Sequence, residues 1–62
     1  MKTEDALLRA LRYEEALYRN NLAFARQVSH PEVVRLFEEH AEEGRRRIQS
    51  LKRYLRALGC ST

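Results

Sequence analysis

The segment VSHPE, residues 28–32, separates two long amphipathic stretches and decides the fold of this chain. Pro31 cannot continue a helix from the preceding residues, but its fixed φ angle suits the first turn of a new helix. Ser29 and Glu32 have the spacing of a capping box, in which a hydroxyl and a carboxylate bind free backbone N–H groups. We therefore predict a tight turn here, with a helix on each side.

Apolar residues recur at helical spacing on both sides of the turn. Before it, one face of a helix would carry Leu7, Ala10, Leu11, Leu17, Tyr18, Phe24, Ala25 and Val28. After it, steps of three and four residues connect Val34, Phe37, Ala41, Gly44, Ile48, Leu51, Leu55 and Leu58. We predict helices over about residues 3–28 and 31–58, with Thr3 capping the first and Gly59 ending the second.

The short chain favours association between copies. A protein of 62 residues buries only about 60% of its unfolded surface and is marginally stable alone. Its one cysteine, Cys60, cannot form an internal disulfide and is expected to be a free thiol. We predict a single all-α domain over residues 1–62, an antiparallel two-helix hairpin that forms a homodimer or higher homo-oligomer. The homodimer would be a four-helix bundle.

Several classes of protein are not favoured by the sequence. No apolar run approaches the ~20 residues that span a bilayer, and MKTEDALLRA (residues 1–10) has acidic residues where a signal peptide is apolar. We therefore expect a soluble, cytoplasmic protein without a membrane partner. The chain contains no phosphate loop, dinucleotide fingerprint or nucleophile motif, so no catalytic residue is predicted and an enzymatic activity is not favoured.

Two polar residues interrupt the first apolar face. Glu14 and Asn21 lie at its centre, one heptad apart. A carboxylate inside a helix bundle costs several kcal/mol unless a cation, metal or proton accompanies it. With the turn near residue 30, Glu14 is level with residues 44–47 and Asn21 is level with His40. We predict an ion pair between Glu14 and Arg47 and a hydrogen bond between Asn21 and His40.

Two segments, ALRYEE (residues 10–15) and PEVVRLFEEHAEEGRRRI (residues 31–48), resemble the rubrerythrin branch of the ferritin-like superfamily. The resemblance extends over about residues 6–55. Proteins of that family bind two irons through Glu and Glu-x-x-His motifs on four helices and handle peroxide, oxygen or stored iron. A chain with two helices would supply half of such a site. The resemblance thus implies a ferritin-like four-helix bundle made of two hairpins.

The ligand positions depart from the family pattern. Glu14 matches the family's first glutamate, but the Glu-x-x-His motif would fall at 44 and 47, where this chain has Gly44 and Arg47. Glycine has no donor atom, and arginine stays protonated and cannot bind a metal. Its guanidinium can instead supply positive charge to Glu14. We predict that an ion pair replaces the di-iron site, without a cofactor, in a structural, regulatory or partner-binding protein whose partner is unknown.

The sequence leaves a metal site open as an alternative. His40 and Glu43 have i, i+3 spacing, and with Glu14 or Glu15 of a second chain they would form a shifted carboxylate–histidine site for iron. The protein would then be a metal-binding protein or an oxidoreductase assembled across the dimer.

A second alternative comes from the charge distribution. Residues 29–43 carry five glutamates against one arginine, whereas residues 44–62 contain no acidic residue. The basic patch of this second segment consists of Arg45, Arg46, Lys52, Arg53 and Arg56, with Arg47 on the flank of the apolar seam. Such a patch is typical of binding to nucleic acid or an anionic surface. Because only Tyr54 adds an aromatic side chain for base stacking, nucleic acid is the least favoured partner.

Overall fold

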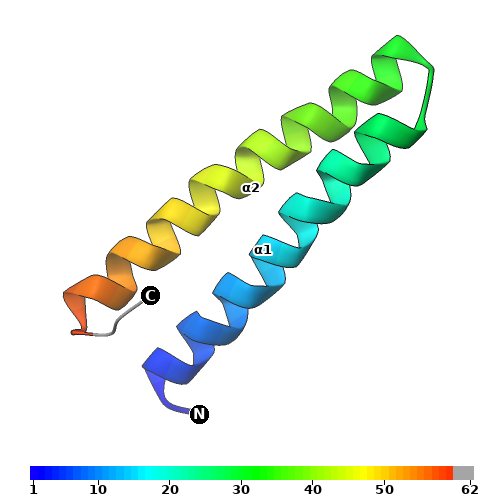
Figure 1. Ribbon diagram of the computed structural model, residues 1–62. Coiled ribbons are helices and arrows are strands. Elements are labelled where there is room, and N and C mark those ends of the chain that lie inside the picture. Colours follow the sequence, from blue (N-terminus) through cyan, green and yellow to red (C-terminus); the bar gives the residue numbers. More distant parts are fainter. Residues whose placement is uncertain (60–62) are drawn as a thin grey trace.

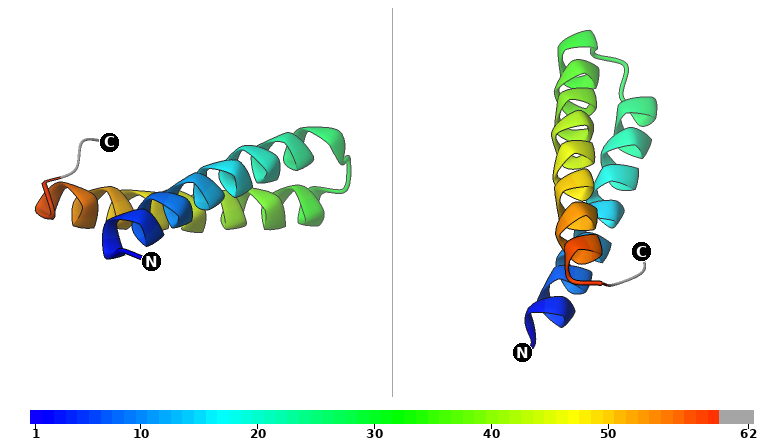
Figure 2. Two further views of the ribbon diagram at one scale, coloured as in Figure 1. Left: turned by 90° about the horizontal axis from the view of Figure 1, so that it is seen from below. Right: turned by 90° about the vertical axis from the view of Figure 1, so that its left-hand side faces the viewer.

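The computed structural model describes residues 1–59 and contains two helices connected by a short turn (Figure 1). Helix α1 is Thr3–Gln27 and helix α2 is Pro31–Ala57. The two helices run antiparallel and side by side along most of their length, and the views in Figure 2 agree on this arrangement. The predicted all-α two-helix hairpin is therefore confirmed, with each helix within one residue of its expected bounds. Cys60 lies outside the described residues.

The helix starts differ from the predicted caps. Lys2 and His30 occupy the two N-cap positions with extended backbone angles, and neither makes a side-chain capping hydrogen bond. Thr3 is already the first residue of α1, so the prediction that it caps this helix is wrong. A capping residue must precede the first helical residue, and Ser29 lies one residue too early to fill that position before Pro31.

The end of α2 follows the predicted pattern. Gly59 has φ +83°, and its backbone N–H donates to the carbonyl of Arg56 at 3.0 Å. Glycine adopts this left-handed conformation without the steric penalty that other residues incur, which is why it commonly follows the last turn of a helix.

The core between the helices is thin. Leu11, Ala41 and Leu55 are its buried apolar residues, and Gly44 is buried with them. All four belong to the predicted apolar faces. Most other residues of those faces are half-buried, because a single neighbouring helix covers only one side of each. Near the turn, the rings of Phe24 and Phe37 contact each other with centroids 5.4 Å apart.

Large apolar side chains remain exposed along the hairpin: Tyr13, Phe24, Leu36, Tyr54 and Leu58. In the described part of the chain, neither helix combines the length and apolar character needed to span a membrane. Phe24 and Leu58 belong to the predicted apolar faces, so these faces are incompletely covered within one chain.

Candidate functional site

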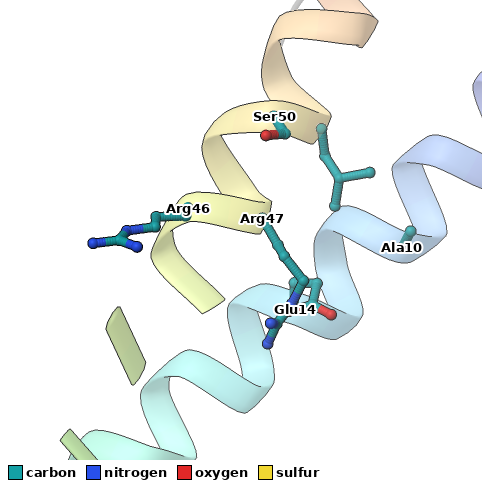
Figure 3. A pocket seen from close by; sticks show the side chains of 6 residues that line it. Ala10, Glu14, Arg46, Arg47 and Ser50 are labelled. Atoms are coloured by element: carbon teal, nitrogen blue, oxygen red, sulfur yellow. The ribbon is translucent and has the colours of Figure 1, made fainter. Parts of the chain in front are cut away.

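An ion pair connects the two helices near the middle of the hairpin. The Nε of Arg47 donates a hydrogen bond to Oε2 of Glu14 at 2.8 Å, with the arginine side chain reaching from α2 to α1 (Figure 3). The Glu14 side chain is 16% exposed and that of Arg47 is 53% exposed. The carboxylate thus lies in the helix interface, whereas the guanidinium covers it from one edge.

Gly44 faces this ion pair from α2. A Cβ atom at Gly44 would lie 3.7 Å from Nη2 of Arg47 and 3.9 Å from Oε2 of Glu14. These are ordinary van der Waals distances, so an alanine would fit. A longer side chain would need the space that the two charged groups occupy. The absence of a side chain at position 44 leaves that space to the ion pair.

The ion pair lines an open recess of about 410 Å³ between the helices. Ala10 and Leu51 supply apolar wall, and the Ser50 hydroxyl lies at its edge (Figure 3). The Arg46 side chain also borders the recess but points away from the ion pair. Among residues 1–59, no side-chain hydrogen bond joins Ser50 to a histidine or a carboxylate.

The second predicted polar contact is not formed. His40 is exposed and Asn21 is half-buried, and within the described residues no hydrogen bond joins them. His40 lies on the flank of α2, where water can satisfy both ring nitrogens. The predicted polar layer of four residues is therefore reduced, within one chain, to Glu14 and Arg47.

The alternative metal ligands do not meet within one chain. Over residues 1–59, no group of three or more His, Cys, Asp and Glu side chains is placed to hold a metal ion. Glu14 binds Arg47, whereas His40 and Glu43 are exposed on α2. A carboxylate–histidine site made from these three residues would require ligands from a second chain.

The basic patch is partly neutralised by a neighbouring acid. Glu42 accepts two hydrogen bonds from Arg45, at 2.7 Å from Nη2 and 3.0 Å from Nε. These hydrogen bonds lower the pKa of Glu42 and raise the pKa of Arg45. Arg46 lies 3.9 Å from the same carboxylate. Arg45 is thus hydrogen-bonded to Glu42 and Arg46 lies close to it, whereas Lys52, Arg53 and Arg56 lie farther along α2.

No protein-family model, curated protein or solved structure matches this chain. The class that the structure defines is the all-α antiparallel two-helix hairpin. Because this arrangement occurs in many unrelated proteins, it supports no family assignment, and the ferritin-like resemblance gains no support from a matching relative.

Sequence reasoning singled out most of the residues around the recess but not Ser50. Ala10 and Leu51 belong to the predicted apolar faces, and Glu14 and Arg47 were predicted to pair. Ser50 follows Arg47 by three residues, a spacing that places two side chains on the same side of a helix. This spacing was the available signal for its position.

Proposed function

We propose that this chain is a non-catalytic, structural or partner-binding protein that works as a homodimeric four-helix bundle. In this bundle the Glu14–Arg47 ion pair takes the position that a di-iron centre has in ferritin-like proteins. The observation that carries the proposal is the 2.8 Å contact between Arg47 and Glu14, beside a glycine at the other expected ligand position.

The register of the hairpin supports this comparison with ferritin-like proteins. In the rubrerythrin-type pattern, residues 44 and 47 would supply the Glu and the His that join Glu14 at the metal. Both positions do lie beside Glu14 in the structure. The residues found there offer no metal ligand, and a guanidinium next to the only inherited carboxylate repels a cation.

The exposed surface supports association. The chain has 4884 Å² of accessible surface, whereas size scaling gives about 4200 Å² for a compact monomer of this mass. The surplus, roughly 700 Å², is close to the ~800 Å² that each partner buries in a typical stable interface. Within residues 1–59, only three apolar side chains are buried, so covering this surface would enlarge a core that one hairpin leaves small.

Light scattering at low micromolar concentration tests the assembly. We expect a mass of about twice the 7.4 kDa of one chain. A well-folded monomer throughout this range would contradict the proposed bundle.

Elemental analysis tests the absence of a metal centre, using protein purified without a chelator or a histidine tag. We expect substoichiometric iron, manganese and zinc after loading under anaerobic conditions and desalting. Retention of about two metals per dimer, lost on Glu14→Ala substitution, would contradict the ion-pair proposal and favour a metalloprotein.

A further inference from the structure

We propose that the second copy covers the recess with its turn at the opposite end of the bundle. The two copies would be related by a two-fold axis that lies between them, perpendicular to the helix axes and level with Glu14 and Arg47. This inference rests on the proposed homodimer and specifies its contact surface and its direction.

The proposed contact surface is the side of the hairpin on which the recess is open, and we call this side the recess face. It comprises Ala10, Leu17 and Phe24 from α1 and Arg47, Leu51 and Tyr54 from α2. In α1 these residues are spaced by heptads, and in α2 Tyr54 follows Arg47 by one heptad, so each set forms a stripe along its helix. Phe24 is 45% exposed and Tyr54 is 64% exposed. Apolar and aromatic residues thus flank the partly exposed ion pair on both sides.

The charges of the hairpin are segregated along its length. The half nearer the turn, residues 15–43, has six acidic and three basic residues and a net charge of −3. The open half, residues 1–14 and 44–59, has three acidic and nine basic residues and a net charge of +6. With both turns at one end, like charge would lie beside like charge. With the turns at opposite ends, each basic half lies beside an acidic half, which is electrostatically favoured.

The position of the ion pair fits a perpendicular two-fold axis. Gly44 is the central residue of α2, and Glu14 is next to the central residue of α1. Arg47 lies within one turn of the centre of α2. When two hairpins pack in opposite directions, only a polar layer near the middle meets its own copy. A layer elsewhere would place a charge against apolar residues, which is unfavourable.

The same axis also pairs exposed apolar groups. Phe24 lies nine residues from the centre of α1 toward the turn, whereas Leu51 and Tyr54 lie seven and ten residues from the centre of α2 toward the open end. The reversed second copy therefore brings its Leu51 and Tyr54 level with Phe24. Aromatic contact at this level would bury two of the large exposed side chains of each hairpin.

Spin-label distances decide the direction of packing. Two variants would each carry one labelled cysteine. Ser29→Cys places the label in the turn, and Arg12→Cys places it near the centre of α1. Both variants also carry Cys60→Ser, so that only the introduced cysteine is labelled. Ser29 and Arg12 are exposed. We expect the two turn labels to be separated by a distance close to the 43 Å length of the hairpin. The Arg12 labels should be closer together than the turn labels, because the width of the bundle rather than its length separates them.

The outcomes separate this inference from the proposed dimer. A separation of the turn labels of about 10–20 Å, as for neighbouring helices in one bundle, would overturn the opposite direction while leaving the dimer intact. A monomeric mass of the labelled proteins in light scattering would overturn both. The expected long distance together with a dimeric mass supports both.

A pair of charge substitutions tests the contact surface. Tyr54→Glu places a carboxylate on the recess face, whereas Gln49→Glu places the same charge on an exposed position about 200° around α2 from Arg47. We expect Tyr54→Glu to raise the dimer dissociation constant about tenfold or more and Gln49→Glu to change it by less than about twofold. Equal effects of the two substitutions would show that the second copy lies elsewhere.

Discussion

Arg47 and Glu14 are separated by 33 positions in the sequence, yet Nε of the arginine lies 2.8 Å from Oε2 of the glutamate. The contact joins the middle of α2 to the middle of α1, beside the buried Gly44. It defines which levels of the two helices face each other. It also gives the partly buried carboxylate a cation, without which its burial would be unfavourable.

The ion pair should show coupling between its two members. Glu14→Leu alone and Arg47→Leu alone are each expected to lower the free energy of unfolding, because each leaves one charge without its partner. Each single variant should lose between the ~1 kcal/mol typical of an exposed ion pair and the ~3–5 kcal/mol typical of a buried one, because Glu14 is mostly buried and Arg47 is not. The double variant should recover much of the loss, as measured by urea unfolding.

The matched control for this cycle is Arg46→Leu, next to Arg47 but with a side chain that is 74% exposed. We expect this substitution to change stability by less than about 0.5 kcal/mol. Strictly additive losses for Glu14→Leu and Arg47→Leu would show that the two side chains do not stabilise each other.

The two glycines should respond to alanine in opposite directions. Alanine at Gly44 makes only ordinary contacts with Arg47 and Glu14, and it should stabilise α2 by about 0.5–1 kcal/mol through its higher helix propensity. Alanine at Gly59 must adopt φ +83° and should destabilise the protein by about 1 kcal/mol. Thermal unfolding followed by circular dichroism would measure both. Destabilisation by Gly44→Ala would mean that position 44 is more crowded than its 3.7 Å contact indicates.

Introducing the ligands of ferritin-like proteins tests the proposed comparison directly. The double variant Gly44→Glu, Arg47→His places a Glu-x-x-His motif next to Glu14 and removes the guanidinium. We expect it to bind about two divalent metals per dimer, detected by elemental analysis, whereas the native chain retains substoichiometric amounts. A variant with Arg47→His alone is the control for removal of the charge. No gain of metal by a folded, dimeric double variant would contradict the proposed ferritin-like ligand geometry.

Acid should weaken the contribution of Glu42. Its pKa is lowered below the ordinary value of 4.5 by hydrogen bonds from Arg45. A carboxylate with a lowered folded-state pKa stabilises the protein above its unfolded-state pKa, and this contribution disappears as the pH falls through the folded-state value. Glu42→Gln should therefore lower the melting temperature slightly at pH 7 and have no effect at about pH 2.

The control for the acid experiment is Glu43→Gln. Glu43 is exposed and, among residues 1–59, accepts no side-chain hydrogen bond. At pH 7, Glu43→Gln should change the melting temperature less than Glu42→Gln does. If the two variants behave alike at every pH, the contact between Arg45 and Glu42 does not contribute to stability in solution.

The hairpin could be predicted from the sequence, because the signals for its helices and its turn are local. A proline at position 31 is incompatible with a continuous helix, and the spacing of apolar residues on each side repeats with the period of a helix. A short turn then requires the two helices to run antiparallel, and counting from it brings Glu14 level with Arg47. Helix boundaries within one residue and the central ion pair could be predicted for this reason.

The burial of each predicted polar residue, and the contacts that it forms, depend instead on how the two helices pack. Residue counting places Asn21 level with His40, but the rotation of each helix about its axis determines whether two side chains meet, and His40 is exposed. The same rotation leaves Arg47 at the edge of the interface and opens the recess between Ala10 and Leu51. Helix rotation depends on the packing of all interface side chains together, so no local pattern in the sequence specifies it.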